Sequence, residues 1–466
     1  MALTKYPSGS LRELVSIALP LMLSSLSVML MVFADRWLLA HFSIEAHNAA
    51  VTATTMAWAF IFGWIVLANI SEVFVAQHNG AGLTNRLGEP VWQMIWLSLS
   101  SVAFFWPLAY WGPELFFGAG FDAEMEREYF CTMTFFGPFY PLYATLCGYF
   151  VGQGKTRMVT CVVIVANVVN VLLDWFLIFG VEGILEPMGV QGAAIATSAA
   201  TFFQAFVLGS VFLSQKHRQQ FGTGLWRLKW DRLLECVKVG LPSSVFSSLE
   251  VFAFAVFYFL MKEMGPTYIT IAGICQALFI LFYFFAEGLN KATATIVGNL
   301  IGARQSDLVS KVIRSGLKLN GLFLILLLTV FVLAKGLIIR EFLPGADPMY
   351  VESIRTTLEL CLFLKTIEIF LAGVRFQFAG VLTASGDTVF LLYSGATLVW
   401  AVLILPVYFF VFRNQGSVEQ ALFIAILYSA SGALLYLWRI LSGHWKKIVI
   451  SADLATNQPQ RSKTVS

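Results

Sequence analysis

Twelve long apolar stretches constrain this chain more than any other feature of its sequence. Each has about 18 to 28 residues, the length at which a helix crosses a hydrocarbon core roughly 30 Å thick. They lie near residues 13–40, 51–77, 91–112, 129–151, 158–180, 190–214, 236–261, 268–299, 316–338, 354–382, 388–412 and 417–440. Because the bilayer core offers no water, each crossing segment must satisfy its own backbone hydrogen bonds. The sequence therefore predicts an all-α integral membrane protein with twelve transmembrane helices.

The composition supports this class and argues against several others. Of the 466 residues, 58% are hydrophobic and 12% are charged, which is more apolar surface than a soluble domain can hide. The net charge of +3 is spread over many loops, so we expect no nucleic-acid partner. The six cysteines stand singly in apolar segments, which predicts neither disulfides nor a zinc site. We expect no cofactor and no enzyme activity.

A helical unit of roughly 210 residues occurs twice along the chain. Gly80-Ala81 recurs 222 residues later as Gly302-Ala303. The same offset separates Leu19-Pro20 from Leu241-Pro242, each near the start of an apolar stretch. Many secondary transporters place a substrate path between two such repeats, related by a pseudo-twofold axis. The repeat therefore predicts two pseudo-symmetric lobes of six helices each, and it favours transport as the function.

The repeat divides the chain into four parts. We expect an N-terminal lobe over residues 1–214 and a C-terminal lobe over residues 236–442. Residues 215–235, rich in Lys, Arg and Gln, are expected to form a cytoplasmic linker between the lobes. The polar tail, residues 443–466, is expected to be disordered because it has little apolar surface to bury.

Lys and Arg collect in alternate loops, and this pattern indicates the orientation of the helices. The basic side holds Lys5, Arg12, Arg86, Lys155, Arg157, Lys216, Arg218, Arg227, Lys229, Arg232, Arg304, Lys311, Arg314, Lys446 and Lys447. The opposite side holds Glu114, Asp122, Glu124, Glu126, Glu182 and Glu186, the exception Arg127, and a mixed loop with Arg340, Glu341, Asp347 and Arg355. Because basic loops stay inside, we expect a multi-pass protein of the cell membrane with both termini in the cytoplasm.

Charged residues inside the apolar stretches are the most informative chemistry, since each costs about 2.5 to 3.5 kcal/mol at a helix centre. Two sets of residues can neutralise each other on one helix face, at spacings of four and three. These are Glu287 with Lys291 and Lys365 with Glu368. Four acids have no opposite charge at such spacings, apart from Arg36, which directly follows the first of them. These candidates for cation or proton binding are Asp35, Glu72, Asp174 and Glu250.

Asp174 has the strongest local support among these acids. Asn167, Asn170 and Asp174 are spaced so that two amides and a carboxylate share one face of the fifth predicted helix. Inside a bilayer such a face must line a cavity or meet another helix, where a cation could reach the carboxylate. Hydrogen bonding between helices is the alternative role for the two asparagines. Thr197, in the sixth predicted helix, could add a hydroxyl nearby.

Short motifs follow one another in a definite order along the chain. The first half contains Ala18-Leu-Pro20, Ala76-Gln77, Gly80-Ala-Gly82, Asn170-x-x-x-Asp174 and Gly189-Val-x-Gly-Ala-Ala-x-Ala-Thr197. The second half contains Gly240-Leu-Pro242, Val297-Gly298, Gly302-Ala303 and Gly380-Val-Leu-x-x-x-Gly-Asp387. Through these motifs the chain resembles the multidrug and toxic compound extrusion (MATE) family of cation-coupled antiporters. The resemblance implies two six-helix lobes around a V-shaped cleft, and export of small organic, often cationic compounds in exchange for H⁺ or Na⁺.

The resemblance also implies a cation site in the N-terminal lobe. Matched position by position, that site consists of Asp35, Asn170, Asp174 and Thr197. We expect alternating access, in which H⁺ or Na⁺ from outside binds the two aspartates and repacks the first helix about Pro20. Binding of the cation and of the substrate would exclude each other. The expected partners are the lipid bilayer and the substrate, and the chain is expected to act as a monomer.

The C-terminal lobe differs from the family pattern. Glu250 matches the acidic residue of the family's seventh helix, but Ala372 stands where some members carry an aspartate. The acidic candidates in this lobe are therefore Glu250, Glu287 and Glu368. Its helices also carry the basic residues Lys291, Lys365 and Arg375. These bases keep two alternatives open, namely export of an anionic or zwitterionic metabolite and flipping of a lipid-linked glycan.

Overall fold

A computed structural model describes residues 3–118, 123–343 and 348–456 of the chain. Within these ranges the regular structure is helical, apart from one isolated bridge between Val181 and Leu185. The two loop acids Asp122 and Asp347, and residues 457–466 of the tail, lie outside the described residues. The prediction of an all-α protein is confirmed.

The described part of the N-terminal lobe (N lobe) contains nine α-helices. They are α1 (Leu11–Phe42), α2 (Ile44–Ala68), α3 (Ile70–Gly80), α4 (Gly88–Ser100), α5 (Val102–Phe116), α6 (Ala123–Phe135), α7 (Phe139–Gly152), α8 (Thr156–Phe179) and α9 (Gly189–Phe212). Helix α1 begins where Ser10 caps it, since the Ser10 hydroxyl accepts a hydrogen bond from the Glu13 amide at 3.2 Å. It continues through Pro20 as a single helix.

The C-terminal lobe (C lobe) repeats this plan with longer helices. They are α11 (Trp230–Met264), α12 (Pro266–Gly302), α13 (Val309–Phe342), α14 (Pro348–Ser385), α15 (Thr388–Leu398) and α16 (Val418–Leu441). Helix α15 continues through two π-helical segments, Val399–Ile404 and Val407–Arg413. Pro406 lies between these segments, and its missing N–H removes one donor from the helical hydrogen-bond pattern.

Ten segments of the described residues are long and apolar enough to cross a membrane. The other two predicted crossings, 129–151 and 354–382, are not among these ten, and each has a structural reason. The first is divided between α6 and α7 at Gly137 and Pro138, where the proline disfavours helix at the residue before it. The second is continuous as α14 but carries Arg355, Glu359, Lys365, Glu368 and Arg375 along its length.

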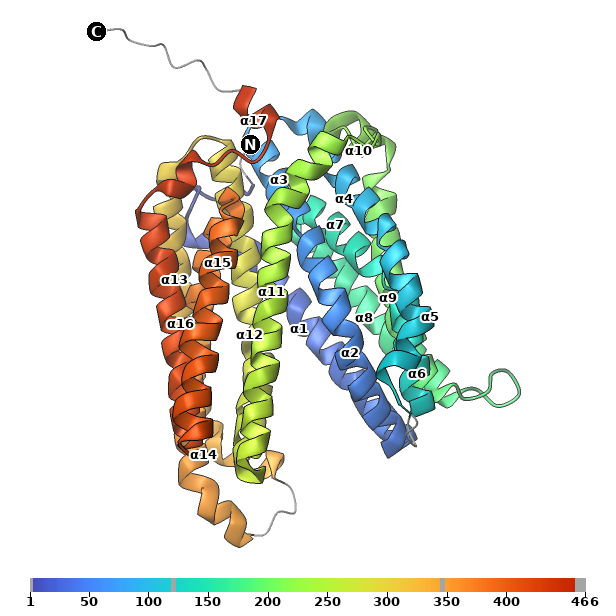
Figure 1. Cartoon of the computed structure of the whole chain (residues 1–466). Coiled ribbons are helices and arrows are strands. Elements are labelled where there is room, and N and C mark those ends of the chain that lie inside the picture. Colours follow the sequence, from blue (N-terminus) through green and yellow to red (C-terminus); the bar gives the residue numbers. More distant parts are fainter. Residues whose placement is uncertain (1–2, 119–122, 344–347, 457–466) are drawn as a thin grey trace.

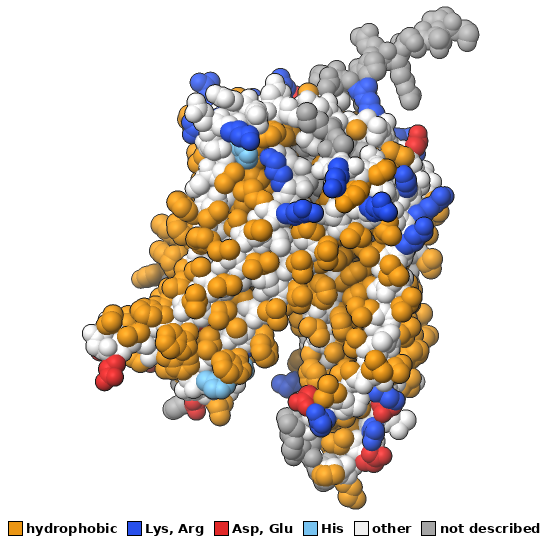
Figure 2. Space-filling model, turned by 180° about the vertical axis from the view of Figure 1, so that it is seen from behind, with side chains coloured by type: hydrophobic (Ala, Val, Ile, Leu, Met, Phe, Trp, Pro, Cys, Tyr) orange, Lys and Arg blue, Asp and Glu red, His pale blue; other side chains and the backbone are white. Residues whose placement is uncertain are grey.

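The two lobes converge at one end of the molecule and separate toward the other (Figure 1). Both described ends of the chain lie where the lobes converge, which we call the closed end. The space-filling view shows a hollow between two separate arms at the opposite, open end (Figure 2). Lys and Arg gather near the closed end, and apolar side chains cover the middle of the molecule. This is the V shape that the sequence resemblance implied.

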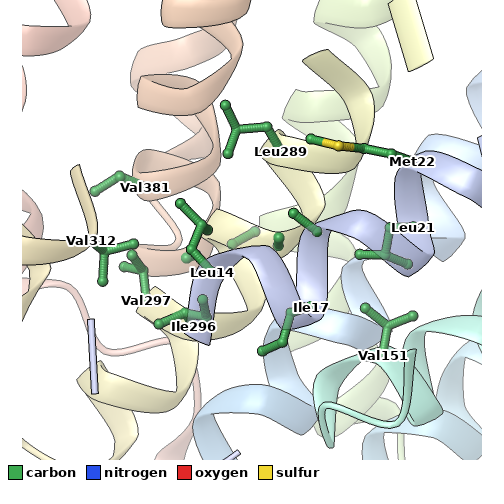
Figure 3. Close-up of a cluster of buried hydrophobic side chains, with 14 of the residues drawn as sticks. Leu14, Ile17, Leu21, Met22, Val151, Leu289, Ile296, Val297, Val312 and Val381 are labelled. Atoms are coloured by element: carbon green, nitrogen blue, oxygen red, sulfur yellow. The ribbon is translucent and has the colours of Figure 1, made fainter. Parts of the chain in front are cut away.

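Helix α1 connects the lobes. Its first half contributes Leu14, Ile17, Leu21 and Met22 to a buried cluster that also includes residues of α7, α12, α13 and α14 (Figure 3). Gly288 of α12 allows this approach, because a Cβ there would meet the backbone nitrogen of Met22 at 2.9 Å. The second half of α1 packs against α8 and α2 within the N lobe. A movement of α1 inside the N lobe therefore reaches the contact with the C lobe.

The glycines of the repeated motif form a reciprocal contact between the lobes. A Cβ at Gly80 would overlap the carbonyl oxygen of Asn299, and a Cβ at Gly302 would overlap the carbonyl oxygen of Gln77. Gln77 and Asn299 are themselves 222 residues apart, like the two glycines. The two contacts are thus equivalent under the pseudo-twofold axis. Only glycine lets α3 and α12 approach this closely.

The linker and the start of the tail are bound to the closed end. After α10 (Gln215–Phe221), the linker backbone accepts hydrogen bonds from the indoles of Trp92 and Trp96, both at 2.7 Å. In the tail, α17 (Ala452–Thr456) follows Ile450, which is buried in a cluster with Cys236 of α11. The expectation of disorder is therefore not met over residues 443–456, because apolar side chains there find a buried surface.

Candidate functional site

The first part of the site lies between α1 and α8. The spacing of Asn167, Asn170 and Asp174 turns all three side chains inward, and each is at least 95% buried. The Asn167 amide donates a hydrogen bond to the Ser27 hydroxyl of α1 at 2.7 Å. The Asn170 amide donates a longer one, 3.4 Å, to the Thr197 hydroxyl of α9. The alternative role of the asparagines in joining helices is therefore present in the structure.

Asp35 of α1 and Asp174 of α8 form what we call the acidic pair. Both are buried, and they lie near enough for their charges to repel each other. Neither oxygen of Asp174 accepts a hydrogen bond from the described residues, and neither does Oδ1 of Asp35. Neither residue forms an ion pair with another described side chain. A buried, unsatisfied carboxylate is costly, so this arrangement favours uptake of a proton or a small cation.

Two tyrosines beside the acidic pair were not found from the sequence. Tyr129 of α6 and Tyr140 of α7 are buried close enough to Asp35 to interact with its charge. No sequence spacing relates them to Asp35, because they reach it from helices that meet α1 only in the folded lobe.

The region around Pro20 ties α1 to α8. The Pro20 carbonyl oxygen accepts hydrogen bonds from the Thr160 hydroxyl at 2.6 Å and from the Ser24 hydroxyl at 3.1 Å. The Ser24 and Thr160 hydroxyls are also 2.9 Å apart. Pro20 thus has a side-chain anchor on α8 about two turns from Asn167. It lies within the part of α1 that contacts the C lobe, since residues both before and after it, such as Leu14 and Met22, belong to the cluster between the lobes.

In the C lobe, by contrast, the acidic residues have basic partners. Glu250 of α11 forms an ion pair with Arg375 of α14, with 2.7 Å between carboxylate oxygen and guanidinium nitrogen. Tyr428 of α16 donates a second hydrogen bond to Glu250 at 2.6 Å. The guanidinium also lies over the rings of Phe376 and Tyr428, 4.7 and 4.9 Å from their centroids. Arg375 therefore occupies the place beside Glu250 that a free cation would need.

The other two C-lobe acids also have bases, as the helical spacings predicted. Lys365 and Glu368 are 2.6 Å apart and almost fully buried. Glu287 and Lys291 are 2.9 Å apart, and about 30% of each side chain remains exposed. Lys365 also lies over the Phe279 ring, 4.7 Å from its centroid. The predicted pairing is confirmed, and each of the three basic side chains singled out in this lobe contacts a carboxylate.

The sequence-predicted site residues therefore fall into two groups. Asp35, Asn170, Asp174 and Thr197 come together in the N lobe. Glu250, Glu287 and Glu368 are in the C lobe, each with its own base. The Glu250 pair could not be found from spacing, because its partner lies on a different helix.

Comparison with known proteins identifies a protein family that this chain matches. The profile described as MatE matches residues 20–176 and 242–409, one match in each lobe. The "Probable multidrug resistance protein NorM" of Thermotoga maritima is 26% identical over 381 residues, covering 81% of this chain and 80% of that protein. The protein of the same name from Synechocystis sp. is 22% identical over 435 residues, covering 92% of this chain and 94% of its own length.

Solved structures share the fold at low sequence identity. A multidrug resistance MATE family transporter of the MOP superfamily, in an outward-facing conformation, matches with a TM-score of 0.84 and 16% identity. The match covers 95% of this chain and 98% of that one. A MOP superfamily transporter from Pyrococcus furiosus, reported with a binding pocket of reverse polarity, has the same TM-score and identity over 95% and 97% of the chains.

Proposed function

The chain belongs to the MATE family of membrane transporters, and from this premise we propose that it is an antiporter. It exports small organic, often cationic compounds in exchange for H⁺ or Na⁺ by alternating access. One observation carries the proposal: within the described part of the chain the acidic pair is buried and forms no ion pair, although the charge of the neighbouring Arg36 acts on Asp35. The three C-lobe acids each contact a base. The N lobe is therefore the place where a coupling cation is needed.

The acidic pair would bind the coupling ion between α1 and α8. Two carboxylates in a buried setting repel each other, and a proton or Na⁺ between them removes that repulsion. Asn170 and Thr197 offer further oxygen atoms for Na⁺, while a proton needs only the carboxylates. The residues thus suit either ion. One charge moving through about 100 mV supplies roughly 2.3 kcal/mol, enough to sustain a gradient of about 40-fold.

Helix α1 would transmit ion binding to the lobe contact. Ion binding draws Asp35 toward Asp174, so it shifts the half of α1 that lies within the N lobe. Met22 lies two residues after Pro20 and packs on Gly288 of α12, so this shift reaches the lobe contact beside the proline that Thr160 holds. A change at the acidic pair therefore alters the contact with α12. This gives a route by which ion and substrate binding exclude each other.

The orientation follows from the charged surface. We place the closed end, where Lys and Arg gather, in the cytoplasm, because basic loops remain inside. Both termini would then be cytoplasmic, and the open end would face outward. The transporter would work as a monomer in the lipid bilayer, because each chain contains both lobes.

The rival substrates are less well supported. An anionic metabolite or a lipid-linked glycan needs basic side chains that are free to bind it. Arg375 and Lys365 are at least 95% buried and contact Glu250 and Glu368. Recruiting either base would leave a buried carboxylate unpaired, which is strongly unfavourable. The arrangement in this chain thus favours a cationic or neutral substrate.

The test is transport in proteoliposomes with a panel of fluorescent organic cations. Proton and sodium gradients are imposed separately on wild type, Asp35→Asn and a control, Glu182→Gln, which changes an exposed loop acid. We expect one gradient to drive transport in wild type and in the control, and not in Asp35→Asn. That gradient identifies the coupling ion.

Protein amount and folding are matched between the variants. The proposal is wrong if Asp35→Asn transports like wild type under the same gradient. It is also wrong if folded wild-type protein moves no cation under either gradient, and anionic substrates would then be tried.

A further inference from the structure

One buried acid has no role in the antiport described above. Glu72 of α3 is 6% exposed, and its Oε1 accepts a hydrogen bond from the Thr295 hydroxyl at 2.6 Å. Thr295 belongs to α12, so this bond crosses from the N lobe to the C lobe. Glu72 therefore lies on the contact between the lobes, on helices different from those that hold the acidic pair.

The backbone of α3 at Glu72 packs closely against α7. A Cβ at Gly148 of α7 would overlap the Ser71 hydroxyl and come within 2.8 Å of the Glu72 nitrogen. A Cβ at Gly152 would meet the Glu72 carbonyl oxygen at 2.7 Å. Helix α3 is thus confined between α7 and α12.

The charges near Glu72 do not balance. Lys291 of α12 lies near enough to attract Glu72, but its closest contact is Glu287, at 2.9 Å. Glu287 is also held from the N lobe, since the Ser25 hydroxyl of α1 donates to it at 2.9 Å. Two carboxylates therefore share one ammonium group. We call Glu72, Glu287 and Lys291 the inter-lobe triad.

We propose that Glu72 is a second proton-binding site, placed on the contact between the lobes and separate from the acidic pair. One proton on Glu72 makes the inter-lobe triad neutral, with Lys291 and Glu287 left as a balanced pair. Solvent can supply that proton, because about 30% of the Lys291 and Glu287 side chains is exposed. The inference deepens the proposed antiport, and its use in transport rests on that proposal.

Protonation of Glu72 changes the attraction between the lobes. When Glu72 is charged, it draws Lys291 and Thr295 of the C lobe toward α3. When it is protonated, the Coulomb attraction to Lys291 is lost and only a hydrogen bond to Thr295 remains. The proton thus weakens the lobe contact at the closed end, which is the contact that an inward-opening step must break.

The other titratable groups near Glu72 are few. From α7, Cys147 and Tyr143 lie within reach of the charges of the triad. Among the described residues, α12 contributes Lys291 and Glu287, and α1 contributes the uncharged Ser25. Thr295 is the closest polar neighbour and cannot take a proton from Glu72. Glu287 is paired with Lys291, so the proposal assigns the added proton to Glu72, which forms no ion pair among the described residues.

The test uses pH-difference infrared spectroscopy of the full-length protein in lipid nanodiscs. A protonated carboxylic acid has its own carbonyl band, which grows as the pH falls. We expect part of this band in wild type, the Glu72 band, to be lost in Glu72→Gln and retained in Glu263→Gln, which changes an exposed acid at the end of α11. In Thr295→Val, loss of the hydrogen bond should tighten proton binding by about tenfold, moving the band about one pH unit higher.

Identical titrating bands in wild type and Glu72→Gln would overturn the proposal. If Glu72→Gln does not fold, Thr295→Val provides the test instead. A band that titrates at the same pH in Thr295→Val as in wild type would then contradict the proposal. The double variant Asp35→Asn/Asp174→Asn separates the two proposals, because its Glu72 band should persist. If the Glu72 band persists in a protein that moves no substrate, only the antiport proposal is contradicted. If wild type transports but shows no Glu72 band, only the proposal of the second site is contradicted.

Discussion

The two lobes are built from one repeated unit, yet they treat their buried acids in opposite ways. In the N lobe, Asp35 and Asp174 lie near each other, and neither pairs with a base in the described residues. In the C lobe, Glu250 contacts Arg375 and Glu368 contacts Lys365. The two lobes share a helical plan, while the acids at their sites are paired differently.

This difference shows how a duplicated fold can assign separate tasks to its halves. A buried acid with its own base is already neutralised and has little free energy to gain from an ion. A buried acid without one gains the full benefit of binding a proton or Na⁺. The N lobe is therefore suited to exchange ions, and the C lobe to keep its charges in place.

The largest expected effect is on coupled transport. Asp174→Asn removes one of the two repelling charges, and we expect gradient-driven transport to fall by about tenfold or more, as for loss of a charged interaction of about 1.4 kcal/mol. The double variant Glu250→Gln/Arg375→Met removes a neutral pair and should remain within about threefold of wild type. Initial rates in proteoliposomes measure both. If the double variant lost coupled transport and Asp174→Asn kept it, the coupling site would lie in the C lobe and not in the N lobe.

A large effect on stability is expected when one partner of the C-lobe pair is removed. Arg375→Met leaves Glu250, whose side chain is only 14% exposed, without a base, which should destabilise the protein by up to about 3 to 5 kcal/mol. Adding Glu250→Gln should restore much of that loss, because no charge is then left unpaired. Thermal unfolding in detergent measures both variants. If Arg375→Met were as stable as wild type, the C-lobe acid would be no better neutralised than those of the N lobe.

A smaller effect should be equal in the two lobes. Gly80→Ala and Gly302→Ala each place a Cβ on the backbone of the other lobe, and we expect about 1 to 3 kcal/mol of destabilisation from each. Gly273→Ala is the matched control, because nothing lies within 4 Å of a Cβ there. Thermal unfolding of all three tests the symmetry. Unequal losses at Gly80 and Gly302 would show that the lobes differ at their junction as well as at their sites.

The smallest expected effect concerns the tail, where Asp453 contacts Arg86 of the N lobe and Arg232 of the C lobe. Burial alone would raise the pKa of Asp453, but hydrogen bonds and charge from Arg232, then Arg86, lower it below the ordinary 3.8. Because the folded pKa is lowered, the stabilisation is complete above that ordinary value. It is lost as the pH falls through the folded pKa.

Asp453→Asn should therefore loosen the tail at neutral pH by about 0.2 to 1 kcal/mol and have little effect in strong acid. Hydrogen exchange of residues 448–454 measures this. Asp307→Asn is the control, because Asp307 is fully exposed 3.8 Å from Lys446 and should change nothing. Equal protection in Asp453→Asn and wild type at neutral pH would show that the tail does not depend on this contact.

Much of the N-lobe site could be predicted from sequence, and much of the C-lobe site could not. Asn167, Asn170 and Asp174 share one helix, so the helical period alone places them on one face. Glu287 and Lys291 were paired for the same reason. Tyr129 and Tyr140 reach Asp35 from two other helices, and no local spacing could indicate that.

The sequence by itself determined the apolar helices, their duplication and the family, because these depend on composition and periodicity along the chain. Only the tertiary structure decided which buried acids are neutralised. Glu250 and Arg375 stand on separate helices, and Glu72 meets Thr295 across the two lobes. A charge is paired or unpaired according to what packs within a few ångströms of it, and that depends on how distant helices come together.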